Sequence, residues 1–458
     1  MFLSKNLLKS LFLILLLAAP FAAQQNGSGA TNPQSQAAAV TEFEVNGLKV
    51  LVKRRANSPT VAVGLFLRGG SKNLTPENAG IENFALETAT ESSVKFPRVA
   101  LRRELAKTGS VINSGTNFDF SALSMATTRA NFDRSWDIFT DVALNPSFAP
   151  EDVARVKDRI LTGLREQTSS PDSYLEILGR QAAFAGHPYA NSPEGTIENV
   201  LRFKPEDLRR YYQSMMQTSR LLLVVVGDIE AAQVKPKVEA AFGKLPRGNY
   251  QDKSVPTLSF STPTIEVTAR QLPTNYIQGT YAAPSPADPD IYAMRVATAI
   301  LRDRVFEEVR VKRNLSYAPG ASLDNRAANT AGIYVSAVDA NRSIGVMLDE
   351  IKKLQENLVD ESDMIGVKGQ YLTTYYLGQE TNLAQTADLA TSELIGGGWR
   401  NSLVFLDKIR AVTPEDVRRV SRKYMRNIRF VVLGNPADIN RQIFTRQSAE
   451  PLTFTQSR

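Results

Sequence analysis

The chain has 458 residues, of which 43% are hydrophobic and 22% are charged, a composition typical of a globular protein of about two to three domains. Its formal net charge is +7, and Lys and Arg are interspersed with Asp and Glu, which argues against nucleic acid as a partner. The absence of cysteine excludes disulfides, a thiol nucleophile and lipid attachment through an N-terminal cysteine.

Residues 1–23 have the features of a secretory signal peptide. Lys5 and Lys9 precede a short apolar run, and small residues follow it. No later apolar run approaches membrane-spanning length, so we expect no membrane span after signal cleavage. The expected location is periplasmic or secreted. Residues 24–40 are small and polar and predict a flexible leader.

The first structured elements are expected from residue 41. Two alternating runs flank Asn46-Gly47, which predicts a β-hairpin, and VAVGLFLRGG at 61–70 predicts a further strand. Residues 78–91, NAGIENFALETATE, predict an amphipathic helix. Asn83, Leu86 and Glu87 stand at positions i, i+3 and i+4 of that helix, so we expect them to project from one face.

An internal repeat organises the rest of the chain. KPEDLRRYYQSMMQTSRLLLVVVG (204–227) matches TPEDVRRVSRKYMRNIRFVVLG (413–434), each a helix beginning with proline and then a buried strand. Residues 124–141 and 334–351 match at nearly the same offset, each a strand, a turn and a helix. The sequence therefore predicts two duplicated α+β halves, each an antiparallel sheet with packed helices, at 41–246 and 264–458. The polar segment 247–263 is the expected linker.

Several chemistries are excluded by the residues present. His187 is the only histidine, so the chain cannot form the imidazole pair of a zinc peptidase. No G-x-S-x-G elbow, phosphate-binding loop or dinucleotide fingerprint occurs. His187, between Gly186 and Pro188, is expected to be a loop residue with a structural hydrogen bond.

Together these segments resemble the M16 metallopeptidases, the family of insulysin, pitrilysin and the mitochondrial processing peptidases. The resemblance is carried by residues 47–73 leading into NAGIENFALETAT, and by GHPYANSPEGT followed by PEDLRRYYQ. It extends from about residue 41 to 440. It implies that the two halves form half of a clamshell.

The resemblance also implies that a zinc site has been lost. Active members carry H-x-x-E-H on the first helix, and those positions are occupied here by Asn83, Leu86 and Glu87. The third ligand, a glutamate, is expected in ARVKDRIL (154–161), where Ala154 and Val156 are not acidic. We therefore expect neither zinc nor another cofactor in this chain.

Two further elements of the family are retained. Arg310 and Tyr317 match an arginine and a tyrosine that bind substrate backbone in active enzymes; we expect Arg310 to close a helix and Tyr317 to begin the next strand. In GSVINSGT (109–116), Asn113 and Ser114 resemble the edge-strand residues that pair with a peptide substrate.

These features favour a non-catalytic, substrate-binding subunit of a heterodimeric zinc peptidase in the cell envelope. Its partner would be an active paralogue that carries H-x-x-E-H and zinc, and its substrates would be peptides. One alternative is an inactive scaffold like the respiratory-complex core proteins that resemble the same family. Another is a module that binds peptides by itself. An enzyme that uses groups marked by no motif has the least support.

Overall fold

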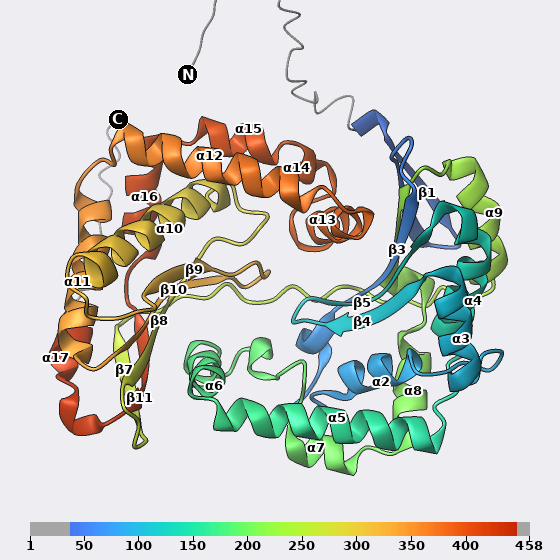
Figure 1. Ribbon diagram of the computed structural model, residues 1–458, viewed down its shortest axis with the longest axis horizontal. Helices are drawn as coiled ribbons and strands as arrows, with labels where there is room; N and C mark the ends of the chain where they lie inside the picture. Colours follow the sequence, from blue (N-terminus) through green and yellow to red (C-terminus); the bar gives the residue numbers. More distant parts are fainter. Residues whose placement is uncertain (1–36, 447–458) are drawn as a thin grey trace, which may run out of the picture.

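The computed structural model describes residues 37–446, so the predicted signal peptide and most of the predicted leader lie outside the described residues. Two sheets, each with its own helices, face each other across the molecule (Figure 1). The first strand begins at Val40, inside the segment expected as a leader. Within residues 37–446, no helix is long and apolar enough to cross a membrane.

The first sheet is six-stranded and contains one parallel pair, β2 and β6. Its strands, in spatial order, are β1 (Val40–Val45), β2 (Leu48–Arg54), β6 (Leu221–Gly227), β3 (Thr60–Arg68), β5 (Phe120–Thr128) and β4 (Val111–Thr116). The accompanying helices are α2 (Ile81–Ala89), α3 (Arg98–Thr108), α4 (Phe132–Leu144), α5 (Pro150–Ser169), α6 (Pro171–Ala183), α7 (Ile197–Arg202), α8 (Pro205–Met215) and α9 (Ala231–Phe242).

The second sheet is five-stranded and contains one parallel pair, β7 and β11. Its strands, in spatial order, are β7 (Thr264–Ala269), β11 (Arg429–Gly434), β8 (Asn275–Ala282), β10 (Thr330–Ala337) and β9 (Gly320–Leu323). Its helices are α10 (Ile291–Val305), α11 (Ala340–Glu356), α12 (Glu361–Gly378), α13 (Asn382–Ile395), α14 (Arg400–Leu403), α15 (Phe405–Ala411), α16 (Pro414–Tyr424) and α17 (Arg441–Phe444).

The strand orders confirm the predicted duplication. Once β1 is set aside, β2-β6-β3-β5-β4 has the same arrangement as β7-β11-β8-β10-β9, and the parallel pair occupies the same place in both. The matched helices α8 and α16 both begin at a proline, which is favoured at the first helical position. The predicted hairpin is also confirmed, since Asn46 and Gly47 have φ of 49° and 86°, as a tight two-residue turn between strands requires.

The face of each sheet that does not pack on the helices of its own half is covered by a helix from the other half. α13, from the second half, places Leu389 and Ala390 against Phe66 and Val224 of the first sheet. α6, from the first half, places Leu175 against β11 of the second sheet. Figure 1 shows both helices nearly end-on between the two sheets. The halves are therefore interlocked by an exchange of helices, in addition to the linker.

Candidate functional site

The three residues at the positions of the family's zinc motif lie on α2, but only two of their side chains contact each other. Asn83 Nδ2 donates to Glu87 Oε1 over 2.9 Å, one helical turn away, and both side chains are half-buried. Leu86 was expected on the same face, and that expectation is wrong: it is fully buried in the hydrophobic core of the first half. A leucine at i+3 is drawn into the core because the adjacent face of α2 packs on the sheet.

A guanidinium from α5 faces the remaining carboxylate. Arg159 Nη2 donates to Glu87 Oε2 over 3.0 Å, and Arg159 Nη1 donates to Glu91 Oε1 over 3.1 Å. Burial lowers the pKa of Arg159, but the two carboxylates outweigh it and raise that pKa overall. Burial likewise raises the pKa of Glu91, but Arg98 and Arg159 outweigh it and lower that pKa. Both groups are therefore held in their charged forms.

The residues at this position do not fit a zinc ion. Of the two positions considered for a third ligand, Val156 is fully buried in the core and Ala154 is exposed. Arg159 is the α5 residue that reaches Glu87, and a fixed cation repels a divalent metal. Across residues 37–446, no group of three or more His, Cys, Asp or Glu is placed to hold a metal ion.

A buried ion pair behind α2 was not anticipated from the sequence. Glu82 is 0% exposed and accepts from Arg220 Nη2 over 2.8 Å, from Ser121 Oγ over 2.6 Å and from Tyr211 Oη over 2.7 Å. Arg220 directly precedes the wholly apolar strand β6, and such a flanking arginine is the one sequence signal that could have pointed to the pair. The cluster ties α2 to β5, to α8 and to the residue that precedes β6, which fixes the helix that carries Asn83 and Glu87.

Arg310 and Tyr317 form a stack on the opposite half of the molecule. The Arg310 guanidinium lies 3.9 Å from the centroid of the Tyr317 ring and 5.0 Å from that of Phe306. Within the described chain it forms no salt bridge and donates no hydrogen bond, while Tyr317 is 78% exposed. A guanidinium held only by aromatic faces keeps its donors available for another molecule.

The backbone around this pair differs from the expected helix and strand. Arg310 lies in η5 (Phe306–Val311), a single π-helical turn that continues α10, so it does close a helix. Tyr317 does not begin a strand, because β9 starts at Gly320. Asn314, with φ of 48°, turns the chain back so that Tyr317 meets Arg310. α10 lies in the left half of Figure 1 and α2 in the right half, so the structure does not bring the pair to the degenerate zinc positions.

The other cations of this turn are already paired. Glu308 accepts from Lys312 Nζ over 2.7 Å and also from Arg313 Nη1. Hydrogen bonds from these two cations lower the pKa of Glu308 to about 2. Arg310 therefore differs from Lys312 and Arg313 in having no acidic partner in the part of the chain that the structure describes.

Asn113 and Ser114 lie on the edge strand, as the resemblance implied. β4 is the last strand of the first sheet and pairs with β5 on one side, with Asn113 opposite Ser124 and Ser114 opposite Leu123. Asn113 is exposed and Ser114 is half-buried. In the part of the chain that the structure describes, no strand pairs with the other edge of β4.

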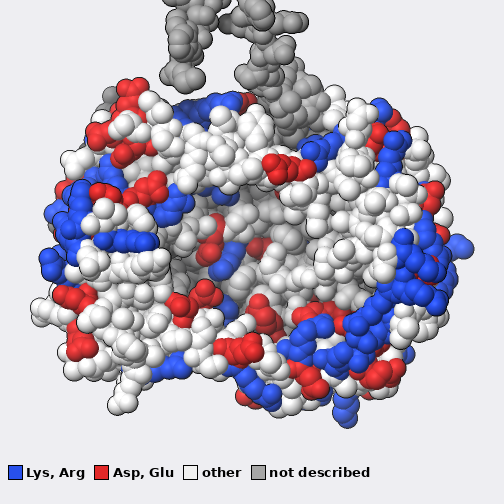
Figure 2. Space-filling model, viewed as in Figure 1, with Lys and Arg blue, Asp and Glu red and all other residues white. Residues whose placement is uncertain are grey.

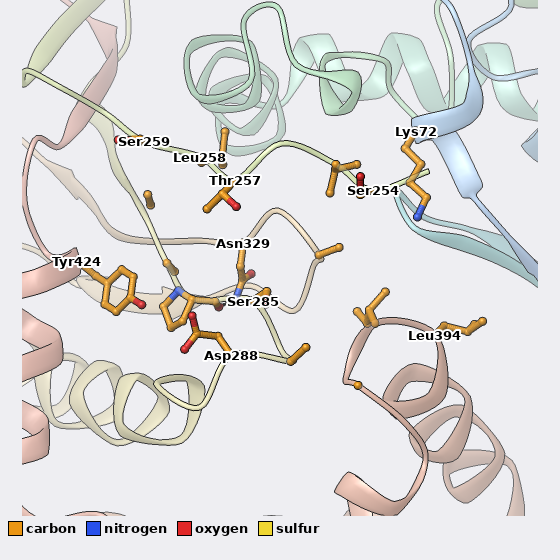
Figure 3. A pocket seen from close by; sticks show the side chains of 18 of the residues that line it. Lys72, Ser254, Thr257, Leu258, Ser259, Ser285, Asp288, Asn329, Leu394 and Tyr424 are labelled. Atoms are coloured by element: carbon orange, nitrogen blue, oxygen red, sulfur yellow. Dashed lines mark hydrogen bonds between the residues drawn. The ribbon is translucent and has the colours of Figure 1, made fainter. Parts of the chain in front are cut away.

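A large cavity lies between the halves beneath the linker. Its volume is about 730 Å³. Figure 3 shows Lys72 of the first half on one side of it and Asp288, Asn329 and Tyr424 of the second half on the other, with Ser254, Thr257, Leu258 and Ser259 of the linker along it. The buried Lys72 Nζ pairs with Asp252 Oδ1 over 2.9 Å. Figure 2 shows a hollow at the centre of the molecule, with charges of both signs around it.

The linker is fastened to the first half by the single histidine. His187 Nδ1 accepts from the Tyr189 backbone N–H over 3.1 Å, and Nε2 lies 3.0 Å from the Pro256 carbonyl oxygen, to which it donates. The predicted structural hydrogen bond is thus confirmed. Tyr189, fully buried, in turn donates to Asp119, which accepts from the Ala327 backbone N–H over 3.1 Å. The junction of the two halves is therefore hydrogen-bonded through Tyr189 and Asp119.

Family models match most of the described chain. The model described as insulinase (peptidase family M16) matches residues 49–197, and the model described as the peptidase M16 inactive domain matches residues 202–371.

Known proteins match the chain as well. Subunit 1 of the bovine mitochondrial cytochrome b-c1 complex is 27% identical over 289 residues, 62% of this chain and 58% of that protein, so the match spans little more than half the length of this relative. An uncharacterized zinc protease of Rickettsia felis is 21% identical over 407 residues, 86% of this chain and 97% of that protein. The solved peptidase M16 inactive domain from Pseudomonas fluorescens superposes with a TM-score of 0.78 at 18% identity, covering 86% of this chain and 98% of that one.

Proposed function

Because this chain belongs to the M16 peptidase family but lacks the H-x-x-E-H motif, we propose that it is a non-catalytic, substrate-binding subunit of a heterodimeric zinc peptidase. Its partner is an active paralogue that carries the motif and the zinc. The subunit is exported, as residues 1–23 suggest, and acts on peptides in the periplasm or outside the cell.

The observation that carries this proposal is the Arg310–Tyr317 stack. The zinc positions have been replaced, yet an unneutralised guanidinium and an exposed phenol remain together on the second half. An arginine fork can donate to a peptide carbonyl, and a tyrosine hydroxyl can donate to a carbonyl oxygen as negative charge develops on it. The partner adds the zinc that this chain does not carry.

The edge strand β4 adds a means of holding the substrate. An extended peptide can pair with the free edge of β4 next to Asn113 and Ser114. The backbone supplies the hydrogen bonds, so this mode suits peptides of many sequences.

The experiment is a pull-down of the tagged mature chain from its own cell envelope, assayed for peptide cleavage. We expect chelator-sensitive cleavage in the eluate and none from the recombinant chain alone. Arg310→Ala lowers turnover of the complex about tenfold or more, the order of one lost charge-assisted hydrogen bond, and leaves assembly intact. Arg302→Ala, a 43% exposed arginine on α10, is the matched control and leaves turnover unchanged. Equal turnover in the Arg310 variant and the wild type would remove Arg310 from the site.

Phe306→Ala tests whether the position of the Arg310 guanidinium matters as well as its charge. This change removes one of the two rings that hold Arg310, so we expect reduced turnover although every donor remains. Val311→Ala, at a neighbouring side chain that is 57% exposed, serves as its control.

An inactive scaffold is the second candidate, favoured by the match to a cytochrome b-c1 subunit. It predicts a stable envelope assembly without peptidase activity, in which Arg310→Ala changes nothing. A self-sufficient peptide-binding module is favoured by the cavity beneath the linker, and predicts saturable peptide binding by the recombinant chain.

A further inference from the structure

A second cavity, distinct from the one beneath the linker, lies among α10, α12, α13 and α15. Its volume is about 400 Å³, within the range of small-molecule sites. It is remote from η5, because it is built on the first turn of α10 and the second half of α12.

One wall of this cavity is aromatic. The Phe405 ring is stacked on Tyr375, with centroids 5.8 Å apart and an interplanar angle of 12°. Tyr292 and Tyr371 each lie 6.2 Å from the same ring. Such a wall supplies a rigid apolar surface at a low cost in side-chain entropy.

Two opposite charges line the cavity without pairing with each other. Arg295, on α10, uses Nη2 to donate to Asn325 Oδ1 over 3.0 Å, and its guanidinium lies 5.8 Å from the Phe405 centroid. Among the described residues, Asp388, on α13, accepts a hydrogen bond from Gln379 Nε2 alone, over 3.1 Å at Oδ2. Within residues 37–446 neither forms a salt bridge, so Arg295 Nε and Nη1 and Asp388 Oδ1 are left for another partner.

The protonation equilibria agree with this geometry. Burial lowers the pKa of Arg295, and the nearby Asp388 and tyrosines offset the effect only in part. Burial raises the pKa of Asp388 despite the Gln379 hydrogen bond and the fields of Lys53 and Arg295. Lys53, on β2, has its own pKa lowered by burial and forms no salt bridge among the described residues. Each charge would therefore be stabilised by a counter-charge brought into the cavity.

We propose that this cavity binds a free α-amino acid as its zwitterion. The ammonium group donates to Asp388 Oδ1, the carboxylate accepts from Arg295, and an apolar side chain rests on the aromatic wall around Phe405. A zwitterion satisfies both charges at once. A lone cation would leave Arg295 Nε and Nη1 without an acceptor, and a lone anion would leave Asp388 Oδ1 without a donor, each at a desolvation cost.

Binding at this site connects the two halves. Asp388 is carried by α13, which packs on the first sheet, whereas Arg295 is carried by α10, within the core of the second half. An amino acid held between them bridges elements that belong to different cores. This site is independent of the Arg310–Tyr317 stack and does not depend on a partner chain.

The test is calorimetric titration of the wild-type mature chain with three related probes. L-phenylalanine carries both charges, L-phenylalaninamide lacks the carboxylate, and N-acetyl-L-phenylalanine lacks the ammonium group. We expect L-phenylalanine to bind and each derivative to bind at least about tenfold more weakly, since each loses one charge-assisted hydrogen bond. L-leucine and L-methionine extend the set of apolar side chains.

Two variants locate the site. Asp388→Asn and Arg295→Gln each weaken L-phenylalanine binding at least about tenfold. Glu356→Gln and Arg103→Gln, at side chains 59% and 66% exposed elsewhere on the surface, leave it unchanged. Because the probe series uses the wild-type chain, it stands even where a variant fails to fold. Equal affinity for L-phenylalaninamide and L-phenylalanine would overturn the proposal. So would the absence of binding of L-phenylalanine, L-leucine and L-methionine at millimolar concentration.

Discussion

Arg159 Nη2 lies 3.0 Å from Glu87 Oε2, so a guanidinium from α5 faces α2 at the position where family resemblance places a metal ion. The guanidinium places a positive charge beside Glu87, but an arginine cannot activate water as a metal does.

Restoring two histidines should therefore not restore zinc binding. Asn83→His with Glu87→His supplies two imidazoles but leaves Arg159 in place, and we expect no stoichiometric zinc by elemental analysis. Adding Arg159→Glu removes the cation and offers a third ligand, so the triple variant should retain zinc through dialysis. Stoichiometric zinc in the double variant would show that Arg159 does not oppose the metal.

Breaking the buried pair of Glu82 and Arg220 should strongly destabilise the first half. Glu82→Gln or Arg220→Met leaves the other charge buried and unpaired, at a cost of about 3–5 kcal/mol in the free energy of unfolding. Urea denaturation measures it, and the double variant should recover part of the loss. Arg210→Gln, at a 77% exposed side chain, is the control and should change stability little. A loss no larger than that of the control would contradict the pair's role.

The Glu308 contacts predict an acid-sensitive contribution to the stability of η5. Lys312 and Arg313 lower the pKa of Glu308 from 4.5 to about 2, so its stabilising effect is fully present above about pH 4.5 and is lost as the pH falls through about 2. The difference in thermal midpoint between wild type and Glu308→Gln should be constant above pH 4.5 and shrink below it. A difference that does not vary with pH would rule out this linkage.

His187 should control how firmly the linker is held. His187→Ala removes the hydrogen bond to the Pro256 carbonyl, and we expect faster limited proteolysis between residues 251 and 259. Lys253→Ala changes the same linker without removing a hydrogen bond between described residues, and should cleave at the wild-type rate. Identical cleavage of the His187 variant would show that other contacts hold the linker.

The sequence predicts the architecture well because two separate pairs of segments indicate the duplication. Two matched helix–strand pairs at nearly one offset imply one strand order used twice, and both sheets have that order. The Asn46-Gly47 hairpin follows from backbone preferences within the turn itself, so it needs no information from distant residues.

The exchange of α6 and α13 could not be predicted in this way. An amphipathic pattern shows that a helix buries one face, but it does not identify the sheet that covers that face. The contact of Arg159 with Glu87 could not be predicted for a similar reason. Nothing in the sequence distinguishes Arg159 from the other arginines before α5 is placed beside α2. The burial of Leu86 and the loop position of Tyr317 also depend on packing beyond their own segments.

The exchange of helices delays the burial of the first sheet during synthesis. All strands of the first sheet have been synthesised once the chain reaches residue 227. The helix α13, which covers one face of this sheet, is complete only at Ile395. Phe66, Leu222 and Val224 on that face therefore stay uncovered while more than a third of the chain is still being made. An apolar sheet face exposed for that time is a binding site for chaperones and a starting point for aggregation, so the nascent chain needs protection until its last third emerges.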